Sequence, residues 1–170
     1  DGLVAWDLIG PMLAAAITTA DKRAVMAKLG PDPLRKDADP ERTWAKLQRS
    51  DKAVGLLLME QDVIAGIGNV YRAELLFLCG IRPDRAAGSL TDNEFDELWR
   101  RTVELMRVGT HLGRIVTTEP DEIGRSRGRM GDEDRLYVYH RSHCRRCGTE
   151  LRTIEVGGRP LQFCPVHQPD

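Results

Sequence analysis

The stretch LLLMEQDVIAGIGNVYRAELLF, residues 56–77, decides the fold of this chain because it joins two apolar segments through a pair of glycines. Gly66 and Gly68 stand two residues apart at the junction, and without Cβ atoms they permit positive φ angles and a close approach of the backbone to another group. The second apolar segment predicts a helix from Asn69 to Cys79. The stretch therefore predicts a helical hairpin with a tight, glycine-rich connection.

The start of this second helix is a candidate anion site. Free N–H groups and the positive end of the helix dipole point outward from a helix N-terminus, and phosphate is the commonest biological anion. The residue at this start is Asn69. An ordinary helical hairpin in which Asn69 serves only as the N-cap explains the same residues, so the stretch taken alone leaves both interpretations open.

Two helices are expected on the N-terminal side of the hairpin. The first is capped by Thr18 or Thr19 and has Gly30 at its C′ position. The second has Asp39 as its N-cap and Pro40 at N1, where a missing N–H costs nothing. These local signals set both helix starts without reference to any tertiary contact.

Two more helices complete the predicted bundle. One reads from about Ser50 into the hairpin, and the other occupies residues 91–113, where Thr91 and Glu94 form a capping box. The apolar stripe of the last helix is core, with no sign of a cofactor site. Cys79 lies on the apolar side of its helix and is expected to be a small buried hydrophobe.

The other three cysteines lie together near the C-terminus. Cys144 and Cys147 form a C-x2-C knuckle, and Cys164 and His167 form a C-x2-H knuckle after sixteen intervening residues. Two such knuckles supply four ligands in the tetrahedral arrangement that zinc accepts. Four protein ligands leave no open coordination position, so the predicted zinc site is structural and not catalytic.

Alternatives to this zinc site carry less weight. Unmetallated surface thiols would need no fixed spacing, and a histidine in the fourth place disfavours an iron–sulfur cluster. His140 and His143 also lie near the first knuckle. His143 is adjacent to Cys144, and chain geometry makes it a poor ligand for the same ion, so His167 is the predicted fourth ligand.

The chain divides into four parts. Residues 1–13 contain a short strand-like run, Leu3–Gly10, and are interpreted as the end of an N-terminal β domain that this sequence lacks. Residues 14–116 form the helical domain, and 117–135, with three glycines and no apolar period, are expected to be a flexible loop. Residues 136–170 have the alternating pattern of short strands around the predicted zinc site.

The composition describes an ordinary globular protein. Of the 170 residues, 41% are hydrophobic and 30% are charged, and the formal net charge is −1. The apolar runs are too short to span a bilayer, and no signal-peptide layout opens the chain, so we expect a protein of the reducing cytoplasm with no membrane partner. All nine basic residues in 123–170 are arginines, which favours nucleic acid as a partner over a merely solvated face.

Three stretches resemble one family. EQDVIAGIGNVYRAELLF (60–77) is similar to the helix–two-turns–helix signature of the formamidopyrimidine-DNA glycosylase and endonuclease VIII family. LGPDPL (29–34) and the terminal cysteine knuckles resemble that family in spacing and position, and DLIGP (7–11) resembles the last strand of its N-terminal domain. The resemblance covers nearly the whole chain. It implies a mainly α fold, a helix–two-turns–helix bundle followed by a small C-terminal β-hairpin zinc finger.

The resemblance also implies a function, which is removal of an oxidised base from DNA followed by strand scission at the abasic site. Asn69 matches the asparagine that holds backbone phosphates beside the damaged nucleotide, and Gly66 and Gly68 belong to the same DNA-binding turn. Arg159 matches the arginine at the tip of the zinc-finger hairpin. The implied partner is damaged or abasic double-stranded DNA, bound by a monomer at the bacterial nucleoid.

Two departures from the family pattern matter. The family's nucleophile is an N-terminal proline followed by a glutamate, whereas this chain begins Asp1-Gly2, so we expect no catalytic residue in this chain and a missing N-terminal catalytic domain as its partner. The family usually has four zinc-binding cysteines, and this chain has His167. The segment 117–135 is unlike the purine-capping region of the family and favours the endonuclease VIII side, with oxidised pyrimidines as substrates.

A function of another class remains open. In that interpretation the chain is a non-catalytic module whose zinc ribbon and helices bind nucleic acid or a protein partner. Helix–two-turns–helix elements occur in a ribosomal protein and a type II topoisomerase as well, so the hairpin alone does not mean repair. A reading frame that opens Met-Pro-Glu upstream of Asp1 would distinguish the glycosylase from the binding module.

Overall fold

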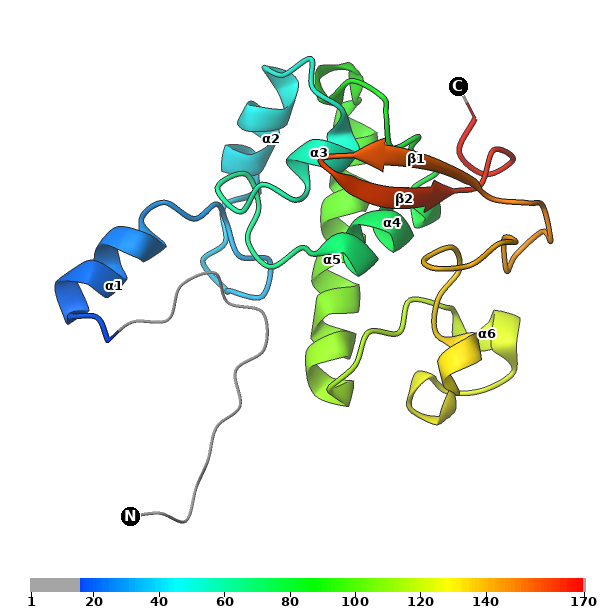
Figure 1. Cartoon of the computed structure of the whole chain (residues 1–170). Coiled ribbons are helices and arrows are strands. Elements are labelled where there is room, and N and C mark those ends of the chain that lie inside the picture. The colour runs from blue at the N-terminus through cyan, green and yellow to red at the C-terminus, as the bar shows by residue number, and fades with distance from the viewer. Residues whose placement is uncertain (1–15, 170) are drawn as a thin grey trace, which may run out of the picture.

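The computed structural model describes residues 16–169, and within them helices predominate (Figure 1). The predicted strand Leu3–Gly10 and the predicted domain end 1–13 lie outside these residues. The α-helices of the described part are α1 (Thr19–Met26), α2 (Pro40–Gln48), α3 (Val54–Leu57), α4 (Asn69–Leu78), α5 (Asp92–Leu112) and α6 (Pro120–Ile123). A two-stranded antiparallel sheet, β1 (Arg152–Val156) and β2 (Arg159–Phe163), follows them. No helix of the described part is both long and apolar enough to cross a membrane.

The helix starts predicted from capping residues are confirmed. Thr18 caps α1 in a capping box with Asp21, and Asp39 caps α2 with Pro40 in the first turn. At α5, Thr91 accepts the N–H of Glu94, and the Glu94 carboxylate accepts the N–H of Thr91. Each of these caps pairs N–H groups that the first turn of a helix leaves without partners. Local chemistry alone is enough to fix such starts.

The predicted end of α1 at Gly30 is wrong. The helix ends at Met26, and Ala27 is its C-cap. Gly30 instead donates its N–H to the carbonyl of Gln61 at 2.8 Å, and a Cβ placed on Gly30 would lie 2.5 Å from the backbone of Val63. The glycine is therefore required by a close approach of two backbone segments and has no part in capping the helix.

The helix predicted from about Ser50 is also wrong in its length. Only Val54–Leu57 are helical, because the residues before them pair with a distant segment. The Gly88 N–H donates to the carbonyl of Ser50 at 2.8 Å, and Ala53 and Ala86 form an antiparallel bridge. These long-range hydrogen bonds keep residues 50–53 out of a helix, and α3 begins only after them.

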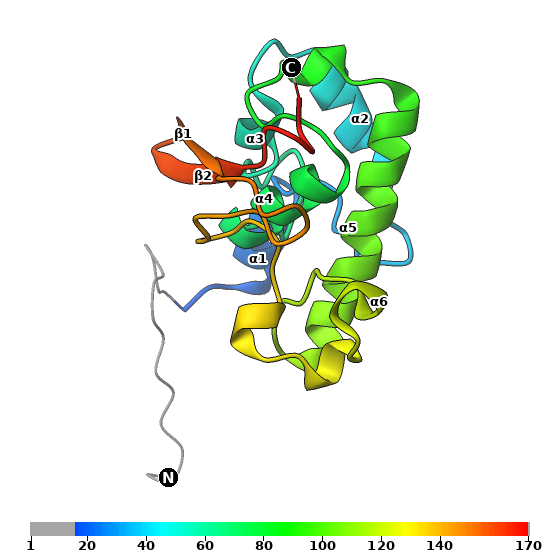
Figure 2. The same ribbon diagram turned by 90° about the vertical axis from the view of Figure 1, so that its right-hand side faces the viewer.

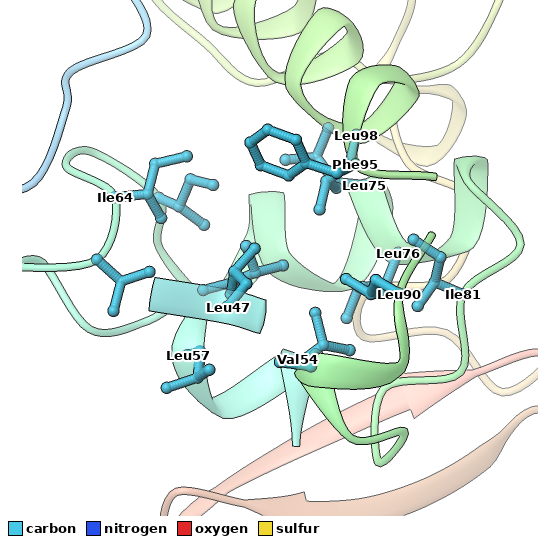
Figure 3. Close-up of a cluster of buried hydrophobic side chains, with 14 of the residues drawn as sticks. Leu47, Val54, Leu57, Ile64, Leu75, Leu76, Ile81, Leu90, Phe95 and Leu98 are labelled. Carbon is cyan, nitrogen blue, oxygen red and sulfur yellow. The ribbon is translucent and has the colours of Figure 1, made fainter. Parts of the chain in front are cut away.

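Helix α4 lies between two hydrophobic clusters, and Tyr71–Phe77, seven consecutive residues, are buried. Figure 3 shows the larger cluster, in which side chains from α2, α3, α4 and α5 meet around Leu47, Leu75 and Phe95. The smaller cluster joins Ala73 and Phe77 to the C-terminal region; its buried partners there are Tyr137, Val138, Cys144, Val156, Leu161 and Cys164. Helix α4 therefore belongs to both cores, with α5 on one side and the β-hairpin on the other (Figure 2).

Segment 117–135 differs from the flexible loop expected. It contains α6 and two short 3-10 helices, Arg127–Arg129 and Asp132–Asp134. Met130 is buried, and the Thr118 hydroxyl donates to the carbonyl of Asp134 at 2.7 Å. The helical turns in this segment are too short to show a periodic pattern of apolar residues. Side-chain hydrogen bonds hold the segment in place instead of an apolar helix face.

The C-terminal strands form a hairpin closed by a two-residue turn. Gly157 and Gly158 both have positive φ, +64° and +69°, which a two-residue antiparallel turn of this hand requires. The register pairs Val156 with Arg159 directly across the strands. Arg159 therefore lies at the first position after the turn, close to the tip, as the sequence predicted.

Candidate metal centre and nucleic-acid interface

Four side chains near the C-terminus converge as a metal-binding group. Ligand atoms of Cys144, Cys147, Cys164 and His167 all lie within 4.8 Å of one another, and the sulfur atoms of Cys147 and Cys164 are 3.6 Å apart. Cys144 and Cys164 are buried and Cys147 is exposed. The structure thus brings together all four residues that the spacing singled out.

The residues present fit zinc. The Nε2 atom of His167 is buried and has no hydrogen-bond partner, and buried polar atoms in native proteins are almost always satisfied. A cation in the centre of the group supplies that partner. Three sulfur ligands and one imidazole make a closed tetrahedral set, so the ion is structural. His143 is not in the group; its ring Nδ1 lies 3.0 Å from the hydroxyl of Ser142.

Backbone hydrogen bonds shape each knuckle. In the first, the Cys144 N–H donates to the carbonyl of Thr149, and Gly148 turns the chain with a φ of +72°. In the second, the buried Gln168 accepts the Cys164 N–H on Oε1 and donates from Nε2 to the carbonyl of Ile81, each at about 2.8–2.9 Å. The second knuckle is therefore fastened to the end of the α4 segment by a side chain just outside the ligand set.

A buried carboxylate on α4 holds the chain that leads into the zinc finger. The two oxygens of Glu74 accept the backbone N–H groups of Tyr137, Val138 and Tyr139, each at 2.8 Å. The Thr117 hydroxyl donates to Glu74 as well, at 2.5 Å. Burial raises the pKa of Glu74 above its ordinary value, and these four hydrogen bonds oppose that rise.

An arginine two residues earlier on α4 links three parts of the molecule. The Arg72 guanidinium donates to the carbonyls of Gly55 at 3.2 Å and Val156 at 3.1 Å, and to Oδ1 of Asn69. Burial lowers the pKa of Arg72, and the positive charge of Arg159 lowers it further. Sequence reasoning missed both Arg72 and Glu74. The signal was available, because two charges stand inside the otherwise apolar run NVYRAELLF.

The glycine turn before α4 is partly as predicted. Gly66 has a φ of +89°, its N–H donates to the Gln61 side chain at 2.9 Å, and a Cβ there would lie 2.7 Å from Met106. Gly68 has an extended φ of −117° and open space where a Cβ would stand, so neither reason for a glycine applies to it. Gly68 is the N-cap of α4 and Asn69 is the first helical residue, so the alternative of Asn69 as N-cap is wrong.

Arg72 links the start of α4 to the hairpin tip, because it donates both to Oδ1 of Asn69 and to the carbonyl of Val156. A hollow of about 270 Å³ beside the tip is lined by residues that include Leu56, Glu60, Gly157 and Arg159. Arg159 is exposed and Asn69 is half-buried. The start of α4 directs free N–H groups toward solvent, and the side-chain amide and guanidinium add donors from two separate elements. Hydrogen-bond donors of this kind suit the oxygen atoms of a phosphate backbone.

Comparison with known proteins agrees with this architecture. A sequence profile described as "Formamidopyrimidine-DNA glycosylase H2TH domain" matches residues 29–121, more than half of the chain. The chain belongs to the formamidopyrimidine-DNA glycosylase family. A second profile, "Zinc finger found in FPG and IleRS", matches residues 142–166 and stops one residue before His167. The histidine ligand of this family member is thus identified by its geometry in the structure.

Individual relatives extend the comparison. "Endonuclease 8 1" of Mycobacterium tuberculosis is 43% identical over 164 residues, which are 95% of this chain and 61% of that protein. "Formamidopyrimidine-DNA glycosylase" of Lactococcus lactis is 36% identical over 140 residues, 82% of this chain and 51% of that protein. A solved complex of the Lactococcus lactis Fpg with DNA containing an abasic site superposes with a TM-score of 0.74 and 30% identity, covering 91% of this chain and 57% of that one.

These comparisons set the scope of the family assignment. The chain spans between about half and three fifths of the length of the curated relatives it matches. The matched part contains the helix–two-turns–helix domain and the zinc finger.

Proposed function

We propose that this chain is the DNA-binding part of a base-excision-repair glycosylase with abasic-site lyase activity. The observation that carries the proposal is the link that Arg72 makes between the α4 start and the hairpin tip, because it holds Asn69 and Arg159, two donors on separate elements, in one arrangement. An amide and a guanidinium on separate rigid elements can grip a kinked phosphate backbone. Such a grip helps offset the few kcal/mol that extruding a nucleotide costs.

The preferred lesion in this proposal is an oxidised pyrimidine. A relative named as an endonuclease 8 is 43% identical, compared with 36% for one named as a formamidopyrimidine-DNA glycosylase, and these values support the endonuclease VIII side. The protein acts as a monomer on chromosomal DNA in the bacterial cytoplasm.

The chemical steps in this proposal belong to a domain N-terminal to the described residues. Support comes from α1, which buries none of its residues and stands apart from the other helices in Figure 1. Ile17, Val25 and Met26 are 57%, 55% and 50% exposed, and exposed apolar side chains of this size offer surface that another domain can cover. A domain of the size that the longer relatives have beyond the matched region would cover them.

The experiment is fluorescence anisotropy of the zinc-loaded chain with a duplex that contains a stable abasic analogue. Asn69→Ala and Arg159→Ala should each weaken binding, and Arg159→Ala should lower the magnitude of the log–log salt slope by about 0.9, the value for one phosphate contact. Arg152→Ala is the matched control, because Arg152 is also an exposed arginine on the hairpin but lies at the end away from the turn.

Two results would contradict the proposal. Wild-type affinity for DNA in both Asn69→Ala and Arg159→Ala would remove the basis for a phosphate grip. It would favour the interpretation of the chain as a zinc-ribbon module that binds a protein. A covalent adduct of this chain with abasic DNA after borohydride reduction would place the chemistry in this chain after all, because only a Schiff base is trapped in that way.

A further inference from the structure

Arg72 is a buried cation whose hydrogen-bond partners are all neutral. It is 0% exposed, its acceptors are two carbonyls and one amide oxygen, and its Nε atom has no partner. Several other partly buried arginines in the described part pair with carboxylates; Arg127, for example, pairs with Glu119 at 2.7 Å. Burying a charge without a counter-charge destabilises a fold, and an apolar side chain of similar size would pack there at lower cost. The position therefore calls for a reason other than stability.

The three acceptors show what Arg72 organises. Gly55 belongs to α3 and Val156 to β1, and Val156 is the residue directly across the strands from Arg159. One guanidinium thus fixes the hairpin tip relative to the helical domain. It does so at Val156 and Arg159, the paired strand residues on either side of the turn. Its planar fork allows contacts in several directions at once, which a lysine ammonium cannot reproduce in the same geometry.

The third acceptor decides which way the Asn69 amide faces. Arg72 has only N–H donors, so the atom of Asn69 that it contacts is the oxygen, Oδ1. The amide nitrogen is then left to point away from Arg72 with its two donor hydrogens. Phosphate oxygens are acceptors only, so this is the orientation that can bind them.

We infer that Arg72 is a positioning residue that sets both arms of the phosphate grip, orienting the Asn69 amide directly and fixing Arg159 through the Val156 backbone. The inference rests on the proposed function. Arg72 itself does not touch DNA, because its side chain has no exposed surface in this arrangement. The uncompensated charge is retained because a carboxylate in the same place would repel the phosphate that Asn69 and Arg159 bind.

The test is a double-mutant cycle on the zinc-loaded chain, with affinity for the abasic-analogue duplex measured by anisotropy. Arg72→Gln and Arg72→Lys are each combined with Asn69→Ala, and Arg107→Gln is the matched control that removes one exposed positive charge on α5. Zinc content and the thermal unfolding midpoint of every variant report whether it is folded at the temperature of the assay. Asn69→Asp is measured beside them, since it leaves an oxygen for Arg72 but removes the two amide donors.

The inference predicts that Arg72→Gln and Arg72→Lys weaken binding to a similar degree, roughly tenfold, about the effect of one ordered hydrogen bond. The loss should shrink in the Asn69→Ala background, because the two residues act through one contact. The log–log salt slope should stay at the wild-type value. Asn69→Asp should bind at least as weakly as Asn69→Ala, since it offers no donor and adds a negative charge.

Three results would overturn the inference while leaving the phosphate grip intact. These are wild-type affinity in Arg72→Lys, full additivity with Asn69→Ala, and a slope reduced by about 0.9 as for a direct phosphate contact. Near-wild-type binding by Asn69→Asp would contradict both the inference and an amide donor at Asn69. The proposed function fails in a different way, because Asn69→Ala and Arg159→Ala would then bind DNA as tightly as the wild type.

Discussion

Replacing Glu74 by glutamine tests how firmly the zinc finger is attached to the helical domain. The two side chains have nearly the same shape, so the substitution leaves no cavity and changes only the hydrogen bonding. Gln Oε1 can still accept from Val138 and Tyr139, which share one oxygen of Glu74 in the structure. The NH2 group of Gln then faces the Tyr137 N–H, which now approaches a donor where it had an acceptor.

The expected loss follows from that single mismatch. A buried N–H without an acceptor costs about 1–3 kcal/mol, and the facing donor adds repulsion, so Glu74→Gln should lower the free energy of unfolding by about 2–3 kcal/mol. The Thr117 hydroxyl contributes little to the loss, because it already has a second acceptor in the carbonyl of Arg135 at 3.2 Å. A loss of this size is a large part of the total stability of a domain.

The pH dependence gives a second observable. Because burial raises the pKa of Glu74 in the folded state, the folded chain holds this proton more tightly than the unfolded chain does. Its contribution to stability is present at low pH and is lost as the pH rises from about 4.5, the ordinary value, through the raised one. Glutamine does not titrate, so the variant keeps its stability over this pH range. The difference in free energy of unfolding between wild type and Glu74→Gln should therefore become smaller as the pH rises.

The assay is urea unfolding of the zinc-loaded chain, followed by far-ultraviolet circular dichroism, with hydrogen exchange of the amides in residues 137–139. Glu155→Gln is the control, since Glu155 is an exposed glutamate on β1. A Glu74→Gln variant within 0.5 kcal/mol of the control, with unchanged protection of those three amides, would refute the reasoning that this carboxylate anchors the finger.

Three further predictions concern the metal, the surface charge and the backbone. His167→Ala should reduce zinc content below one ion per chain by atomic absorption, whereas His167→Cys should retain it, because four thiolates also satisfy zinc. Arg100, chiefly by hydrogen bonding, lowers the pKa of Glu97 to about 2, so Glu97→Gln should cost stability above about pH 4.5, and this cost should disappear as the pH falls through about 2. The cost should stay below about 1 kcal/mol in thermal unfolding, since Glu97 is 37% exposed. Gly30→Ala should cost roughly 1–3 kcal/mol in urea unfolding because its Cβ meets backbone, whereas Gly128→Ala, with its nearest contact at 3.7 Å, should be near neutral.

The features that could be predicted from the sequence all depend on residues that are close together along the chain. The capping box of Thr91 with Glu94 involves residues three apart, and each zinc knuckle is four residues long. Signals of this kind are contained within a few residues and act before any tertiary contact forms. The position of Arg159 beside the hairpin turn is similar, because two adjacent glycines leave the turn only one place to form.

What escaped prediction depends on partners far along the chain. The Arg72 contact with Val156 joins residues 84 apart, and the Glu74 contacts with the finger join residues 63 to 65 apart. The early end of α1 and the late start of α3 have the same cause, since Gly30 and Ser50 pair with distant backbone. A single sequence contains both partners of each contact but nothing that says which of many partners is chosen.

Because α4 packs in both hydrophobic cores, the helical domain and the zinc finger cannot be exchanged independently. A zinc finger grafted from a relative would bring its own backbone against Arg72 and Glu74, which are tailored to the strand and linker of this chain. A chimera joined after residue 116 would therefore keep its metal, but Asn69 on α4 and the arginine at the hairpin tip would no longer be aligned with each other. The unit of exchange that preserves recognition runs from the glycine turn at Gly66 to the last zinc ligand, and recombination within it should yield folded proteins that bind DNA weakly.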